Sequence, residues 1–123
     1  MTENQAMLWV EALRSGKYKQ TSGHLKDKRG YCCLGVLCEI SGKVSFNKLF
    51  NIFGNYSIGS EKMTTVLPIE VRNEFGLYDY EGGIPNKCIE IDGIEYECLA
   101  EANDKGVPFN KLADWIEENY MYL

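Results

Sequence analysis

Residues 31–40 are Tyr31-Cys32-Cys33-Leu34-Gly35-Val36-Leu37-Cys38-Glu39-Ile40, the longest stretch of the chain that is almost free of polar side chains. A run this apolar belongs in the core, and its Leu and Cys content favours a helix because only Val36 and Ile40 are β-branched. Gly35 inside a helix costs about 1 kcal/mol relative to Ala, so we expect another backbone or ring to approach closely there. Gly42 suits the residue that ends the helix. The sequence therefore predicts a buried central helix at residues 32–41.

Helix signals occur on both sides of this central stretch. A helix over about residues 3–15 is predicted by the capping-box spacing of Thr2 and Gln5 and by the apolar stripe that follows at helical intervals. Another helix is predicted after Leu67, with Pro68 at its first helical position and Gly76 just past its end.

The C-terminal third of the chain predicts one long helix and one short one. Apolar residues recur at helical spacing over residues 108–120, which indicates an amphipathic helix with Trp115 on its flank. Residues 99–102 have the pattern of a helical turn, and the sequence Asn-Asp-Lys-Gly at residues 103–106 is typical of the turn that would stop it.

Two β-hairpins are predicted. Residues 88–98 alternate apolar and acidic side chains around Asp92-Gly93, a dipeptide that supplies the positive φ angles of a tight turn. The side chains expected to face inward there are Cys88 or Ile89, together with Ile91, Ile94 and Tyr96. Residues 17–31 predict two shorter strands around a turn near 27–30, and residues 43–66 predict a loop-rich excursion with a short helical or extended piece. The fold class expected is α+β: one domain, residues 1–123, of about four helices and short antiparallel hairpins.

The composition limits the class of protein. A chain of 123 residues can bury about two-thirds of its unfolded surface, so it needs neither a metal nor a disulfide to fold. The five cysteines include an adjacent pair and no CxxC motif, and no signal peptide is recognisable, which predicts a reduced cytoplasmic protein. No apolar run approaches the roughly 20 residues that span a bilayer, so no membrane partner is expected.

Charge is distributed unevenly along the chain. Residues 1–31 carry six basic and three acidic side chains, a net charge of +3, which leaves −8 of the total of −5 on the remainder. Long nucleic acid is an unfavourable partner for such a chain, because its affinity depends on neutralising many phosphates. A small anionic ligand for the basic segment, or a basic protein for the acidic one, fits this distribution better.

The basic segment 17–31 is the candidate binding site. Its charged groups can donate to a phosphate, its two tyrosines can stack on a base, and Gly23 lets a backbone amide approach an anion closely. No Walker or dinucleotide glycine pattern is present, and the plain alternative is an ordinary solvated hairpin. Asn103 and Asp104 are turn formers by type, with ligand binding as a second role. The candidate ligand-binding residues are Lys17, Tyr18, Lys19, Gln20, Gly23, His24, Lys26, Arg29, Tyr31, Asn103 and Asp104.

Other chemistries are less well supported by the residues. Cys33 is a candidate nucleophile, because a helix N-terminus lowers a thiol pKa and His24 lies nine residues upstream. No third orienting group or oxyanion loop is recognisable, so buried apolar packing explains the cysteines better and no catalytic residue is assigned. One histidine and an adjacent cysteine pair make a poor tetrahedral set, so neither a metal nor another cofactor is expected. Glu90, Glu95 and Glu97 form the solvated face of a half-buried hairpin, or an acidic surface for a basic partner.

Several blocks of the sequence resemble a family of short, uncharacterised proteins widespread in tailed bacteriophages. The blocks are Trp9 with Ala12-Leu13-Arg14-Ser15-Gly16-Lys17-Tyr18-Lys19-Gln20, the run Tyr31-Cys32-Cys33-Leu34-Gly35-Val36-Leu37-Cys38, Leu67-Pro68 with Phe75-Gly76-Leu77, and Leu99-Ala100-Glu101-Ala102-Asn103-Asp104 with Leu112-Ala113-Asp114-Trp115-Ile116-Glu117. They cover most of the chain. The resemblance implies a phage accessory protein in the host cytoplasm, and by analogy a counter-defence factor that sequesters a nucleotide signal or blocks a host protein.

The function expected from these observations is non-enzymatic. The protein would bind and sequester a small anionic, nucleotide-derived ligand through residues 17–31, as a homo-oligomer suggested by its aromatic surplus and its tail at residues 120–123. The first alternative is an inhibitor whose acidic residues at 90–101 and 114–118 dock on a basic host defence protein. The second is a small Cys-dependent hydrolase.

Overall fold

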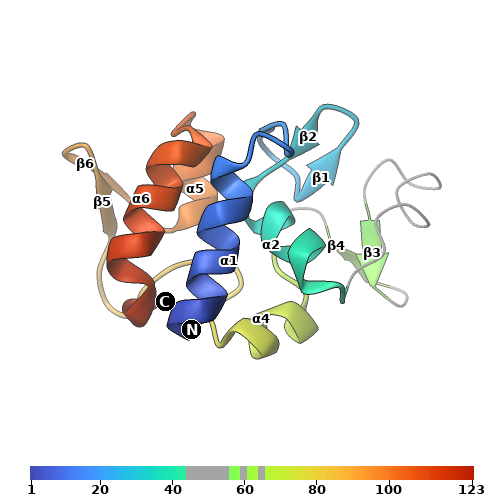
Figure 1. The fold of residues 1–123 in the computed structure, drawn as a ribbon, viewed down its shortest axis with the longest axis horizontal. Coiled ribbons are helices and arrows are strands. Elements are labelled where there is room, and N and C mark those ends of the chain that lie inside the picture. Colours follow the sequence, from blue (N-terminus) through green and yellow to red (C-terminus); the bar gives the residue numbers. More distant parts are fainter. Residues whose placement is uncertain (44–55, 59–60, 64–65) are drawn as a thin grey trace.

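The computed structural model describes residues 1–43, 56–58, 61–63 and 66–123 (Figure 1). Within this part of the chain there are five α-helices, a short 3₁₀ helix and three antiparallel pairs of short strands. The α+β class predicted from the sequence is confirmed. The excursion predicted for residues 43–66 lies mostly outside the described residues, apart from the pair formed by β3 (Tyr56–Ile58) and β4 (Glu61–Met63).

The first and last helices pack along one another (Figure 1). Helix α1 (Glu3–Arg14) begins with the predicted capping box, in which the Gln5 amide donates to Thr2 Oγ1 at 3.2 Å and Thr2 N donates to Gln5 Oε1 at 3.0 Å. Helix α6 (Phe109–Asn119) continues into the 3₁₀ helix η1 (Tyr120–Tyr122). Both helices were predicted, and α6 buries Trp115 against the core.

Helix α2 (Cys33–Ser41) is the buried centre of the molecule, as predicted. Its N-terminal turn accepts a hydrogen bond from the Trp9 indole to the Cys33 carbonyl at 2.9 Å. A Cβ atom added at Gly35 would lie 1.7 Å from the carbonyl oxygen of Leu25, so the glycine is required by the close approach of a neighbouring backbone. Gly42 ends the helix in the left-handed conformation.

The two remaining helices differ from their predictions at their ends. In α4 (Ile69–Phe75), Pro68 is the extended N-cap residue and not the first helical residue, whereas Gly76 closes the helix as predicted. Helix α5 (Leu99–Asp104) does not stop at residue 102. It continues through Asn103 and Asp104 because their side chains bond to distant parts of the chain and do not form a local turn.

Two hairpins flank the helices. β1 (Lys26–Asp27) pairs with β2 (Gly30–Tyr31), and β5 (Ile89–Ile91) pairs with β6 (Ile94–Tyr96) through a turn in which Asp92 and Gly93 both have positive φ. The turn and pairing of the second hairpin are confirmed. The prediction that Ile94 faces inward was wrong. Helix α6 packs on β5 and α5 contacts β6, but neither helix covers Ile94, which is 56% exposed. Between the two alternatives left open, Ile89 is buried and Cys88 is exposed.

Candidate functional site

An open pocket lies where the β1–β2 hairpin and its preceding segment meet α5. Its volume is about 480 Å³, within the range of ordinary small-molecule sites. The lining residues come from two stretches some 80 positions apart: Lys19, Gln20, Thr21, Ser22 and Arg29 from the first, and Asn103, Asp104, Gly106 and Pro108 from the second. Five of the eleven candidate residues are therefore brought together here: Lys19, Gln20, Arg29, Asn103 and Asp104.

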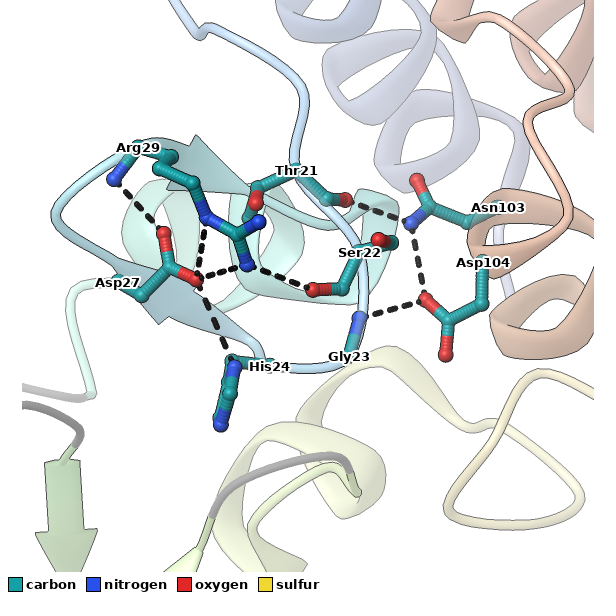
Figure 2. A network of polar contacts seen from close by, with 8 residues as sticks. All are labelled: Thr21, Ser22, Gly23, His24, Asp27, Arg29, Asn103 and Asp104. Atoms are coloured by element: carbon teal, nitrogen blue, oxygen red, sulfur yellow. Dashed lines mark hydrogen bonds and ion pairs between the residues drawn. The ribbon is translucent and has the colours of Figure 1, made fainter.

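Asn103 forms the floor of the pocket and is 2% exposed. Its Nδ2 donates to the Thr21 carbonyl at 2.9 Å, and its Oδ1 accepts from the Gln20 side chain at 2.9 Å and from the Cys33 amide at 3.1 Å (Figure 2 shows the Thr21 bond). Cys33 is the first residue of α2, so Asn103 satisfies one of the amides that a helix leaves unpaired at its start. The side chain joins three elements and has no donor or acceptor left for a ligand.

The side chain of Gln20 is likewise hydrogen-bonded within the protein. Besides bonding Asn103, its Nε2 donates to the Val107 carbonyl at 2.9 Å, and its Oε1 accepts from the Phe109 amide at 3.1 Å. The side chain thus ties the basic segment to the start of α6. Both amide side chains proposed as ligand contacts from sequence act in this structure as links between elements.

Arg29 extends from the hairpin turn over the pocket and is 66% exposed. Its guanidinium donates to Asp27 Oδ2 through Nη2 at 2.9 Å and Nε at 3.3 Å, and its Nη2 also lies 3.4 Å from the Ser22 carbonyl (Figure 2). Burial acts to raise the pKa of Asp27, but the hydrogen bonds and charge of Arg29 outweigh it and lower that pKa below its usual value. His24 Nδ1 lies 3.5 Å from the same carboxylate oxygen.

The Gly23 amide, predicted to approach a ligand anion, is bonded to an anion of the protein itself. It donates to Asp104 Oδ1 at 3.0 Å, and the same oxygen lies 3.3 Å from Asn103 Nδ2 (Figure 2). Gly23 has φ of +84°, a conformation that other residues rarely adopt. The Gly23 amide therefore does bind a carboxylate, and that carboxylate belongs to Asp104.

The other candidate residues lie away from the pocket lining. Tyr18 and Tyr31 pack edge to face with ring centroids 5.1 Å apart, and the Lys26 ammonium lies 4.9 Å from the Tyr31 ring centre. Burial raises the pKa of Tyr18. Lys17 and His24 do not line the pocket either. Four residues of the pocket lining were not predicted, namely Thr21, Ser22, Gly106 and Pro108. The only sequence signal for them is that they lie close to Gly23 and Asp104 along the chain.

The cysteines of the central run are buried packing residues. The Cys33 thiol is fully buried and points at the Leu99 carbonyl, 3.7 Å from its Sγ. Burial raises the pKa of Cys33 well above its usual value and that of Cys32 to about 12. The alternative of a Cys33 thiol activated by the helix N-terminus is not supported, because desolvation outweighs the effect of the helix terminus on its pKa. In the described ranges, no three His, Cys, Asp or Glu side chains are grouped to hold a metal ion.

A second hollow, of about 210 Å³, lies between the β5–β6 hairpin and α6. Acidic side chains from both predicted acidic segments line it, including Glu90, Asp92, Asp114 and Glu118. Part of this charge is neutralised within the protein. Lys111 pairs with Asp92, and the Arg14 guanidinium pairs with Asp114 and Glu117.

The fold and the pocket define a small α+β protein in which a basic hairpin and a short helix enclose an open polar site of mixed charge. The profile of a family described as a domain of unknown function (DUF8296) matches residues 1–120, and the chain belongs to this family. No curated protein and no solved structure matches the chain. Among the helices that the structure describes, none has the length and apolar content needed to cross a membrane.

Proposed function

We propose that the protein binds a small anionic, nucleotide-derived ligand in the pocket between the β1–β2 hairpin and α5. The observation that carries this proposal is the pair of cations on the pocket wall. Lys19 makes no ion pair within the described residues, and Arg29 uses Nε and Nη2 internally while its Nη1 bonds to none of them. Charged donors with unused hydrogen-bonding capacity are what a phosphate oxygen requires.

The ligand is bound and released unchanged in this proposal. Support comes from the two thiols at the start of α2, which include the candidate nucleophile Cys33. Cys32 and Cys33 are buried with raised pKa values, so little thiolate is present at neutral pH. A binding protein needs no such group.

The biological setting is sequestration in a phage-infected bacterial cytoplasm. The resemblance of several sequence blocks to short tailed-phage proteins supports that origin, and a phage protein that removes a nucleotide signal would act as a counter-defence factor. Self-association into a homo-oligomer is part of the proposal, and the exposed side chains of Met121 and Tyr122 next to the C-terminus support it.

Native mass spectrometry of the protein alone and with a panel of linear and cyclic nucleotides tests binding and subunit count together. Lys19→Ala should weaken binding of any retained nucleotide by roughly tenfold, because one charge-assisted hydrogen bond is lost. The matched control is Lys28→Ala, which removes the same charge from the exposed hairpin turn outside the pocket and should leave affinity unchanged. Recovery of the intact nucleotide after denaturation separates sequestration from turnover.

Two results would overturn this assignment. One is the absence of an adduct with every nucleotide in the panel. The other is an equal loss of affinity in Lys19→Ala and Lys28→Ala, which would indicate attraction to overall charge and not to the pocket.

A second candidate is an inhibitor that docks its acidic surface on a basic host protein. It is favoured by one observation: the acidic residues of β5 and α6 lie together around one hollow although they are far apart in sequence. Such binding would weaken with added salt, would be reduced by Glu118→Gln, and would be indifferent to Lys19→Ala. Internal pairing of Asp92 and Asp114 reduces the charge available, so this candidate stands second.

A further inference from the structure

The anion pocket contains a carboxylate that cannot contact an anion favourably. Asp104 lines the pocket opposite the hairpin, and two donors, the Gly23 amide and Asn103 Nδ2, fix its Oδ1. Its Oδ2 has no hydrogen-bond partner among the described residues, and the residue is exposed. Asp104 therefore adds to the pocket lining a carboxylate whose orientation is set through Oδ1 and whose Oδ2 can accept a hydrogen bond.

The charges of the lining limit how negative a ligand can be. Two cations, Lys19 and Arg29, are opposed by the Asp104 carboxylate, and Arg29 is already paired with Asp27. A triphosphate would place several negative charges in a pocket with little net positive charge, whereas a single phosphate group adds only one or two. The pocket therefore suits a ligand with a single phosphate.

The same arrangement requires a hydrogen-bond donor on the ligand. A ligand that contacts Asp104 Oδ2 displaces the solvent around this oxygen. Binding is then unfavourable there unless the ligand donates a hydrogen bond to the oxygen in return. Figure 2 shows Arg29 and Asp104 on opposite sides of residues 21–24, so the donor belongs to the end of the ligand remote from its phosphate. In a nucleotide that end is the base, and the donor it offers there is an exocyclic amino group.

We propose that the ligand is a nucleoside monophosphate or phosphodiester with an amino-bearing base, its phosphate at Lys19 and Arg29 and its amino group donating to Asp104 Oδ2. This inference rests on the proposed function and adds the charge and the base chemistry of the ligand. Asp104 then acts as the residue that discriminates between bases, and the hairpin cations supply affinity that all nucleotides share.

Titration calorimetry of the full chain with GMP, AMP and IMP tests the assignment, because IMP lacks the 2-amino group of GMP and carries an oxo group where AMP carries its 6-amino group. The wild-type protein should bind AMP or GMP roughly tenfold more tightly than IMP. Asp104→Asn keeps the oxygen that accepts from Gly23 but places an amide donor where Oδ2 was, so it should abolish or reverse this preference. Asp104→Ala should abolish it without reversal, and Lys28→Ala should keep it.

The outcomes separate this proposal from the one on which it depends. Equal affinity for the three probes in the wild-type protein, or a preference that survives in both Asp104 variants, overturns the assignment to Asp104 while anion binding stands. Absence of binding by all three probes and by the cyclic nucleotides overturns anion binding itself, and this proposal with it. Circular dichroism of each variant shows whether a lost preference is instead a lost fold.

Discussion

The two fully described hairpins are alike in size and pairing but contact the C-terminal helices α5 and α6 through different forces. The β5–β6 hairpin lies on α5 and α6 through the apolar side chains of Ile89, Ile91 and Tyr96. The β1–β2 hairpin and the segment before it are joined to α5 by the polar side chains of Gln20 and Asn103. One attachment is non-directional and the other depends on the position of individual donors and acceptors.

This difference has a consequence for function. Apolar packing tolerates small changes of shape and fixes a strand only approximately, whereas a satisfied buried polar network specifies one geometry. The hairpin attached by polar bonds is the one that carries the pocket cations, Lys19 and Arg29. The hydrogen bonds of Gln20 and Asn103 thus hold this segment in one position, and with it the charged side chains that line the pocket, as a binding site requires.

The largest expected effect comes from near-isosteric substitutions at the two attachments. Asn103→Asp keeps the shape of the side chain but replaces a donor by an acceptor facing the Thr21 carbonyl, and it buries a charge beside Asp104. We expect a loss of about 3 kcal/mol in the free energy of unfolding. Ile89→Val, which removes one buried methyl group, should cost only about 1 kcal/mol. Urea unfolding at pH 7 measures both.

Asn110→Asp is the control for the chemical change alone. Asn110 is exposed in the first turn of α6, so its substitution should alter stability by less than about 0.5 kcal/mol. Costs of equal size for Asn103→Asp and Ile89→Val would contradict the distinction between the two attachments.

A smaller effect is expected at Gly23, in the bend that precedes β1, and at Gly93, in the β5–β6 turn. Gly23 has φ of +84° and Gly93 has φ of +79°, and an added Cβ would meet nothing within 4 Å at either position. Substitution by Ala should therefore destabilise the protein by a similar amount at either position, about 1 kcal/mol, through backbone strain alone. Only Gly23→Ala should also weaken nucleotide discrimination, because its amide positions Asp104.

Thermal unfolding and the AMP and IMP titrations, carried out on both glycine variants, measure these two effects separately. A loss of base preference in Gly93→Ala as large as that in Gly23→Ala would show that general loosening, and not the Asp104 contact, is responsible.

The features predicted correctly from the sequence are those determined by neighbouring residues. The capping box at Thr2, the Asp92-Gly93 turn and the stops at Gly42 and Gly76 each depend on a few adjacent positions. The central helix at residues 33–41 follows from its own apolar composition, and even the close approach at Gly35 could be expected because a helix interior disfavours glycine.

The features that the sequence alone did not predict depend on contacts between distant residues. Asn103 resembles a turn former when viewed with its neighbours, and only its bonds to Gln20, Thr21 and Cys33 explain why α5 includes it. The exposure of Ile94 depends on how far α6 extends over the hairpin. The pKa of Cys33 is raised because burial outweighs the opposite effect of the helix N-terminus. In each case a packing partner decided between two locally acceptable outcomes.

The smallest expected effect concerns the ion pair on the turn of the β1–β2 hairpin. The pKa of Asp27 is lowered by Arg29, so its charged form is favoured in the folded state and contributes stability above the unfolded pKa of about 4. That contribution is lost as the pH falls through the lower, folded pKa. Asp27→Asn should therefore reduce the melting temperature slightly at neutral pH, and the difference from wild type should shrink as the pH falls below about 4. Glu118→Gln, which removes an exposed carboxylate of α6 that makes no hydrogen bond to the described residues, provides the matched control and should show no such pH dependence. A difference between wild type and Asp27→Asn that persists unchanged to pH 3 would mean that shape, and not the charge of Asp27, maintains the hairpin turn.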